Sequence, residues 1–209
     1  GLLGHVVLGD RQGVGVDPDG AKAERGYRMW GLDPQRKTIL VTGGSQGAVN
    51  INAALAGAVE RLTAEGFQVL HAYGRKNDAP AKHDHYTAVS YIDDMEAAYA
   101  VADVVVCRSG AMTVAENSAA GLPAIYIPLP HGNGEQGLNS AHLVATGAAL
   151  RIDDAALTAD TLVETLVPLL HDDARLAEMR DALEHSGAGS VAEDLAQRIV
   201  EAAGAARKD

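Results

Sequence analysis

The chain has 209 residues, of which 47% are hydrophobic, and its formal net charge is -11. This length and composition suit one globular domain, and the acidic balance argues against nucleic acid as a partner, because phosphate neutralisation needs a basic face. The single cysteine, Cys107, excludes an internal disulfide and a cysteine-rich metal site, and no apolar run is long enough to span a bilayer, so we expect a cytoplasmic protein.

Residues 1–36 carry the least regular pattern. Residues 6–8 could form a strand, residues 11–20 are rich in glycine, aspartate and proline and predict a loop, and residues 21–30 predict a helix. We interpret residues 1–36 as an arm or the remnant of an inter-domain linker, and residues 37–209 as the main domain.

Beyond this arm, short apolar runs alternate with segments whose apolar residues recur at helical spacing. The apolar runs predict strands at residues 38–42, 67–72, 86–90, 104–107, 124–127 and 149–152. The other segments predict helices at residues 48–65, 95–101, 113–120 and 136–146. Because strands that alternate with helices favour a parallel sheet, we predict an α/β fold with a doubly wound, Rossmann-like parallel sheet of about six strands.

A helical tail follows the last predicted strand. Its helices are predicted at residues 159–171, 173–185 and 191–205. Thr158, Asp172 and Ser190 precede these helices and are predicted to cap them, because their side-chain oxygens can accept from unpaired N–H groups. We expect the tail to pack on the outside of the sheet.

Two glycine-containing turns each join a predicted strand to a helix. Residues 43–47 follow the first strand, and residues 108–113 follow the fourth. The N–H groups at a helix start lack partners and the helix dipole is positive there, so an anion such as phosphate is favoured. The two turns therefore suggest a phosphate-bearing ligand held at the carboxyl ends of parallel strands.

These features also have ordinary interpretations. Residues 43–47 lack the lysine of a Walker loop and the spacing of the dinucleotide fingerprint, and could form a tight turn without a ligand. The Glu116 carboxylate, one turn beyond the second glycine turn, could accept two hydrogen bonds from a ribose diol or could simply face solvent. The amides of Gln136 and Asn139 could bind sugar hydroxyls or serve as ordinary capping groups.

Other polar residues favour structural roles. Asp93 and Asp94 could be a metal or acid/base pair, but we interpret them as an acidic helix start that complements the dipole. His71 and His131 have no second histidine at metal-ligand spacing, so no metal site is predicted. Cys107 falls in a predicted buried strand and is interpreted as a core residue.

Five segments of the chain are similar, in order and spacing, to one enzyme family. They are residues 43–48, 91–95, 102–116, 121–124, and 134–136 with Asn139. These segments resemble the C-terminal domain of the MurG family, particularly its actinobacterial branch, and the resemblance covers residues 27–202. Members of the family transfer N-acetylglucosamine from UDP-N-acetylglucosamine to lipid I (undecaprenyl-diphospho-muramoyl-pentapeptide), which forms lipid II in peptidoglycan synthesis.

The resemblance implies one half of a GT-B glycosyltransferase, in which two Rossmann-like domains face each other across a cleft. The C-terminal half holds the UDP-sugar. The turn that contains Gly44, Ser45 and Gln46 would contact the diphosphate, and the backbone of Ile92 would pair with uracil. The family uses backbone donors and helix dipoles on the diphosphate, so the resemblance implies no metal and no cofactor.

The second glycine turn and the helix at residues 136–146 would complete the donor site. The residues expected to meet the phosphates and the sugar are Ala111, Met112 and Thr113. Glu116 would bind the ribose hydroxyls, and Gln136 the N-acetylglucosamine. Asn139 joins this predicted substrate-binding set as a second amide.

The family's N-terminal domain has no counterpart in the resemblance. That domain binds the acceptor lipid I at the inner face of the cell membrane, and it carries a histidine proposed to deprotonate the acceptor. The catalytic residues therefore stay unassigned, and His5 is only a superficial match to that histidine. We expect the chain to bind UDP-N-acetylglucosamine but to be inactive alone, with an exposed cleft face that could drive self-association.

Three further functions fit the same residues. The chain could be the catalytic subunit of a split membrane glycosyltransferase, whose partner binds the acceptor. It could be part of a natural-product glycosyltransferase, because such enzymes share the fold. It could also be a non-enzymatic module that binds nucleotide sugars.

Overall fold

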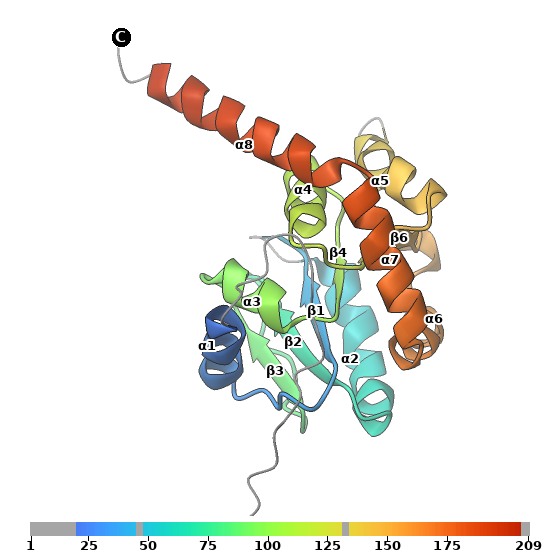
Figure 1. The fold of residues 1–209 in the computed structure, drawn as a ribbon. Helices are drawn as coiled ribbons and strands as arrows, with labels where there is room; N and C mark the ends of the chain where they lie inside the picture. The colour runs from blue at the N-terminus through green and yellow to red at the C-terminus, as the bar shows by residue number, and fades with distance from the viewer. Residues whose placement is uncertain (1–19, 45–47, 131–133, 206–209) are drawn as a thin grey trace, which may run out of the picture.

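The computed structural model describes residues 20–44, 48–130 and 134–205, and in these ranges six parallel strands form one sheet (Figure 1). The strands are β1 (Thr38–Thr42), β2 (Gln68–Ala72), β3 (Tyr86–Val89), β4 (Val104–Cys107), β5 (Ala124–Tyr126) and β6 (Ala149–Arg151). The predicted α/β fold with a doubly wound parallel sheet is therefore confirmed. The candidates His5, Ser45 and Gln46 lie outside the described residues.

The order of the strands creates a reversal at the centre of the sheet. That order is β3-β2-β1-β4-β5-β6. The chain runs outward from β1 to β3 and then crosses back, so that β4 pairs with β1 from Ile39↔Val104 to Val41↔Val106. Ligands of open α/β sheets bind beyond the carboxyl ends of the strands at such a reversal. Here it lies between the two strands that the glycine turns follow.

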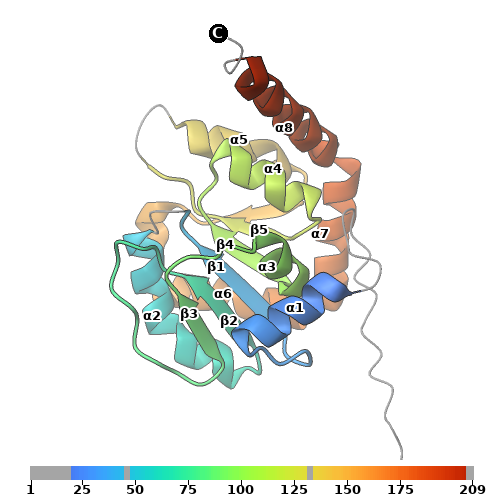
Figure 2. The same cartoon turned by 90° about the vertical axis from the view of Figure 1, so that its left-hand side faces the viewer.

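Helices cover both faces of the sheet (Figures 1 and 2). One face is covered by α2 (Val49–Ala64), α6 (Ala159–His171) and part of α7 (Asp173–His185). The other is covered by α1 (Ala21–Trp30), α3 (Met95–Val101), α4 (Ala111–Ala119) and α5 (Glu135–Ala145). A short 3-10 helix, η1 (Asp154–Ala156), follows β6, and α8 (Ala188–Ala205) ends the described chain.

The central strands are buried on both sides, which explains their unbroken apolar sequence. Ile39 and Val41 belong to the core against α2 and α6, whereas Leu40 belongs to the core on the opposite face. Successive side chains of a strand alternate between faces, so a strand covered twice needs apolar residues at every position. The same alternation places Cys107 in the core beside α4, as the sequence predicts.

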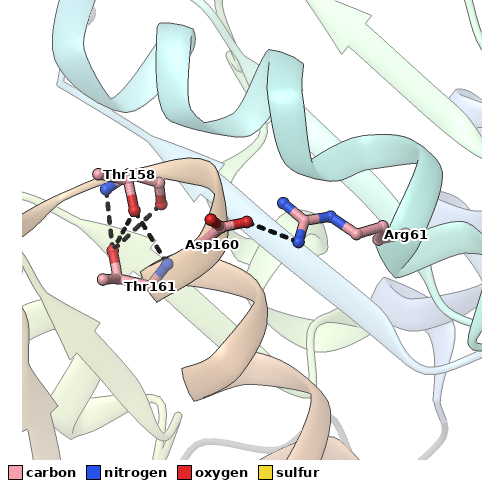
Figure 3. Close-up of polar contacts among 4 residues, drawn as sticks. All are labelled: Arg61, Thr158, Asp160 and Thr161. Carbon is pink, nitrogen blue, oxygen red and sulfur yellow. Dashed lines mark hydrogen bonds and ion pairs between the residues drawn. The ribbon is translucent and has the colours of Figure 1, made fainter.

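The helical tail begins with two capped helices. Thr158 and Thr161 form a capping box at the start of α6 (Figure 3). The Asp172 side chain accepts from Arg175 N–H at the start of α7. Both predicted caps are therefore confirmed. Arg61 of α2 and Asp160 of α6 also form an ion pair of 2.8 Å, which joins the two helices on this face (Figure 3).

Two helix starts differ from the prediction by more than one residue. The last helix begins at Ala188, so Ser190 lies inside α8 and does not cap it. Gly187 has a φ of 69°, a left-handed conformation that turns the chain in one residue and lets the next helix start at once. Similarly, α4 begins at Ala111 and not at Thr113, because Gly110 in an extended conformation already serves as its N-cap.

The described part of the arm packs on the domain. Arg25 of α1 donates to the Asp94 carboxylate at 2.6 Å. A Cβ atom on Gly26 would lie 2.7 Å from Cγ1 of Val101, so α1 and α3 approach each other closely at this glycine. Residues 20–36 therefore cover the sheet face that α3 and α4 also cover.

The last helix contacts α4 and then runs away from the sheet (Figures 1 and 2). Its residues Ile199 and Val200 are exposed. Across residues 20–44, 48–130 and 134–205, no helix has both the length and the apolar character that crossing a bilayer requires.

Candidate functional site

A hollow of about 420 Å³ lies at the carboxyl edge of the sheet, at the reversal between β1 and β4. The hollow is lined by the ends of both strands, by the described residues of the two glycine turns, by the first residues of α2 and α4, and by Leu129 and Gln136. The two turns are far apart in the sequence, yet the strand order makes β1 and β4 neighbours and so brings both turns to one cavity. Both turns therefore meet at one cavity, and their binding of one ligand stays a prediction.

The N-terminus of α4 presents free backbone donors at this hollow. Gly110 is the N-cap and has no side chain to cap the helix. The first N–H group with an intrahelical partner is that of Val114, which donates to Gly110 C=O at 3.0 Å. The preceding N–H groups, of Ala111, Met112 and Thr113, have no partner among the described residues. Together with the helix dipole they form a site that favours an anion.

The N-terminus of α2 faces the same hollow. Ala48 is its N-cap and likewise makes no side-chain cap hydrogen bond. Gly44, predicted to contact a diphosphate, has a φ of 84°, a left-handed conformation that glycine adopts without strain. Two helix starts without side-chain caps therefore point their positive ends at one cavity.

Glu116 lies one turn beyond these donors on α4. Residues three and four apart share a helix face, so Glu116 lies on the face of Met112 and Thr113. Its side chain is exposed, and its Oε2 accepts a hydrogen bond from the Tyr99 hydroxyl at 3.1 Å. A carboxylate has about four acceptor positions, so the remaining ones can take a diol.

Gln136 and Asn139 bind the turn before α4. Oε1 of Gln136 accepts from the N–H groups of Ser109 at 3.3 Å and Leu129 at 2.8 Å, and the Ser109 hydroxyl donates to Gln136 C=O at 2.7 Å. Asn139 Nδ2 donates to Ser109 C=O at 3.0 Å. Both amides thus hold the second glycine turn against α5, whereas contact of either with a sugar stays a prediction.

Ile92 combines a buried side chain with an unpaired backbone. Its side chain is 3% exposed, which fixes the segment between β3 and α3 in the core. Neither its N–H nor its C=O has a hydrogen-bond partner among the described residues. A donor and an acceptor side by side at the carboxyl edge suit the edge of a flat polar ring such as uracil.

The sequence reasoning missed an ion pair whose arginine, Arg108, lines the hollow. Nη1 of Arg108 lies 2.6 Å from Oδ1 of Asp154 and 3.2 Å from Ile127 C=O, and Asn50 Nδ2 donates to Oδ2 of Asp154 at 2.9 Å. The side chains of Arg108 and Asp154 are only 14% and 12% exposed. This network ties the second glycine turn to η1 and to the first turn of α2.

One signal could have identified Arg108. It directly follows the buried strand β4, where a cation must find an acceptor. Asp154 carried no signal, because it lies 46 residues later and no local pattern joins the two. Tyr99 was missed for the same reason, since its contact with Glu116 joins two helices.

Asp94 plays the helix-start role that was predicted for it, whereas Asp93 precedes the cap and lies 3.9 Å from Nη2 of Arg75. Asp94 is the N-cap of α3 and accepts from Ala97 N–H at 3.1 Å. Its hydrogen bond with the Arg25 guanidinium, together with the Ala97 bond, lowers the pKa of its carboxyl. In the part of the chain that the structure describes, no group of three or more histidines, cysteines or acids is arranged to hold a metal ion.

Comparison with known proteins agrees with this geometry. The profile of the glycosyltransferase family 28 C-terminal domain matches residues 38–199. The chain is 50% identical to a Corynebacterium efficiens protein named UDP-N-acetylglucosamine--N-acetylmuramyl-(pentapeptide) pyrophosphoryl-undecaprenol N-acetylglucosamine transferase, over 98% of this chain and 57% of that protein. A protein of the same name from Mycolicibacterium smegmatis is 50% identical over 86% of this chain and 48% of its own length.

Solved structures give the same result. The crystal structure of Acinetobacter baumannii MurG matches 83% of this chain and 53% of its own, with a TM-score of 0.63 and 29% identity. A glycosyltransferase of kitacinnamycin matches 90% of this chain and 46% of its own, with a TM-score of 0.58 and 26% identity. The chain spans about half the length of the relatives it matches. The predicted resemblance to the C-terminal domain of MurG is confirmed, and the chain belongs to the glycosyltransferase family 28 C-terminal domains.

Proposed function

We propose that this chain is the donor-binding part of the transferase that moves N-acetylglucosamine from UDP-N-acetylglucosamine to lipid I, which forms lipid II. The observation that carries the proposal is the convergence of two uncapped helix starts on one hollow, in a chain half identical to transferases of that name. The relatives are longer than the match, and in this proposal the acceptor is bound by the part of them that this chain does not align with.

In this proposal the backbone donors of α4 and the glycine turns bind the diphosphate. When the acceptor hydroxyl attacks the anomeric carbon of N-acetylglucosamine, the bond from that carbon to the β-phosphate oxygen breaks and UDP leaves with added negative charge. N–H groups of Ala111, Met112 and Thr113 are fixed before the reaction, so they stabilise that charge without reorganisation. No metal ion is needed for this role.

The nucleoside contacts follow from two features. The unpaired backbone of Ile92 would exchange hydrogen bonds with uracil, and the free acceptor positions of Glu116 would take the ribose diol. Gln136 lines the hollow, and its NH2 group, which has no hydrogen-bond partner among the described residues, would donate to the sugar.

The first test is calorimetric titration of the chain with UDP-N-acetylglucosamine and with UDP-glucose, both in EDTA. We expect metal-independent binding that prefers the N-acetylated sugar and that is lost in Glu116→Ala. Glu60→Ala, which removes an exposed glutamate of α2, is the matched control and should bind as the native chain does. Absence of binding by the native chain would contradict the proposal.

The second test is a transfer assay with lipid I. We expect the 209-residue chain alone to form little lipid II, because the acceptor hydroxyl must be positioned and deprotonated by groups outside the donor site. Rapid lipid II formation by the chain alone would contradict this expectation. Activity that appears only with a separate membrane-bound partner would favour a split transferase, and binding without turnover in every reconstitution would favour a nucleotide-sugar-binding module.

A natural-product glycosyltransferase is the second candidate. It rests on the likeness to the kitacinnamycin enzyme, at 26% identity. The transferases that use lipid I have about twice that sequence identity to this chain, so we favour them over the natural-product enzyme. Preference for another nucleotide sugar over UDP-N-acetylglucosamine in the titration would reverse this order.

A further inference from the structure

Tyr99 and Glu116 form a contact between two helices at the edge of the proposed donor site. Tyr99 lies in the second turn of α3, and its hydroxyl donates to Oε2 of Glu116 on α4 at 3.1 Å. In the described chain, this hydroxyl is the one group that hydrogen-bonds the Glu116 carboxylate. The side chain of Glu116 is otherwise exposed, so Tyr99 alone restricts its orientation.

The tyrosine is itself held firmly. Its ring packs against the core cluster that includes Cys107 and Tyr126. Burial, and then the nearby charge of Glu116, raise the pKa of the Tyr99 hydroxyl, so it stays a donor across the physiological range. A donor on a partly buried ring that packs on the core can fix a carboxylate on a long, exposed side chain.

The helix that carries Tyr99 also follows the segment of Ile92. Asp94 caps α3 and is bound by Arg25, so the start of this helix is fixed two residues after Ile92. The proposed uracil contact and the contact to Glu116 are therefore joined through one short helix. Base and ribose positions are set by the same element.

We propose that Tyr99 is a positioning residue that orients Glu116 to bind both hydroxyls of the ribose, and so determines the preference for ribonucleotides over 2′-deoxyribonucleotides. The inference rests on the proposed function. Both oxygens of the Glu116 carboxylate must face the two ribose hydroxyls at once. A carboxylate that rotates freely before binding would lose conformational entropy when it binds, and this loss would weaken the binding. Tyr99 removes that loss by holding Oε2 before the ligand arrives.

The test compares UDP with 2′-deoxy-UDP by calorimetric titration of the native chain and Tyr99→Phe. The phenylalanine keeps the packed ring and removes only the hydroxyl. We expect UDP to bind about three- to tenfold more weakly to the variant, whereas 2′-deoxy-UDP changes by less than about twofold. The ratio of the two affinities is the informative quantity, because general destabilisation would weaken both ligands together.

A matched control removes the hydroxyl of Tyr126, a buried tyrosine of the same cluster. Tyr126 accepts from Asn117 Nδ2 at 3.3 Å and makes no hydrogen bond to Glu116. Tyr126→Phe should therefore keep the native affinity ratio. In the Glu116→Asp background the shortened side chain no longer reaches the hydroxyl, so adding Tyr99→Phe should change nothing further.

The outcomes separate the two proposals. If the native chain does not bind UDP, or binds both nucleotides equally, the proposed donor site is wrong and the inference falls with it. If the native chain prefers UDP and Tyr99→Phe keeps the full preference while folded, the donor site stands and the role of Tyr99 is wrong. If Tyr99→Phe does not fold, an unchanged affinity ratio between the native chain and Glu116→Asp would equally overturn that role.

Discussion

At the scale of single residues, His71 shows how burial fixes a protonation state. It lies on β2, 1% exposed, with Nε2 2.8 Å from Asn52 Oδ1 and Nδ1 2.6 Å from the Tyr86 hydroxyl. The Asn52 oxygen can only accept, so Nε2 carries the proton and Nδ1 accepts from Tyr86. The ring is satisfied while neutral, and burial lowers its pKa from 6.5 to about 4.

This lowered pKa predicts loss of stability in acid. The unfolded chain takes up a proton on His71 below pH 6.5, whereas the folded chain resists until about pH 4. The contribution of neutral His71 to the free energy of unfolding is therefore complete above pH 6.5. It is lost as the pH drops toward 4 and amounts to about 2 to 4 kcal/mol in total. Urea unfolding at several pH values measures the slope. His71→Gln should flatten it, whereas replacing the exposed His83 by glutamine should not, and equal slopes in both variants would refute the prediction.

At the scale of elements, two ion pairs of similar geometry differ in burial. Arg108 and Asp154 join β4 to η1 at 2.6 Å with 14% and 12% exposure, whereas Arg61 and Asp160 join α2 to α6 at 2.8 Å with 46% and 75% exposure (Figure 3). An exposed pair is screened by water, and a buried cation without its partner is costly. The two pairs therefore form a matched comparison.

We predict that Asp154→Ala lowers the free energy of unfolding by about 2 to 4 kcal/mol, because it strands the Arg108 guanidinium. Asp160→Ala should cost less than about 1 kcal/mol. Chemical denaturation of both variants measures the difference. Equal losses would mean that the Arg108 pair is not held as described.

The contact of α1 with α3 gives a second prediction at this scale. A Cβ at Gly26 would lie 2.7 Å from Val101 Cγ1 and 2.9 Å from the Ala97 carbonyl oxygen. Gly26→Ala should therefore destabilise by about 1 to 3 kcal/mol despite the better helix propensity of alanine. Gly204→Ala, in α8 with nothing near its Cβ, should stay within about 0.5 kcal/mol of the native chain. Stabilisation by Gly26→Ala would show that α1 can move off α3.

At the scale of the whole molecule, both core clusters share one sheet, so we expect residues 20–187 to unfold as one cooperative unit. Differential scanning calorimetry should give a single transition whose calorimetric and van't Hoff enthalpies agree. The C-terminal end of α8 extends away from the rest of the domain (Figure 1). Truncation after Gly187 removes this helix and should keep a single unfolding transition. Two resolved transitions in the truncated chain would contradict a shared core.

The sequence predicted the sheet, its connections and the convergence of both turns, because unbroken apolar runs and helical spacing are local signals. Ile39 to Val41 and Val104 to Val106 are such runs. The contacts that complete the site are not local. The hydrogen bonds between Tyr99 and Glu116, between Arg108 and Asp154, and between Ser109 N–H and Gln136 each join residues far apart in the sequence. They depend on how the elements pack, so no sequence spacing predicts them. Helix starts at Ala111 and Ala188 were missed by two and three residues, because a single glycine ended the preceding segment.

The placement of Cys107 has a practical consequence. It is the chain's only cysteine, it ends β4 directly before the second glycine turn, and it borders the hollow while only 1% exposed. Burial raises the pKa of its thiol to about 12, so alkylating reagents reach a reactive thiolate only when this edge of the sheet opens. The rate at which Cys107 is alkylated therefore reports how often the proposed donor site opens in the native state. A ligand bound between the two helix starts should slow this alkylation.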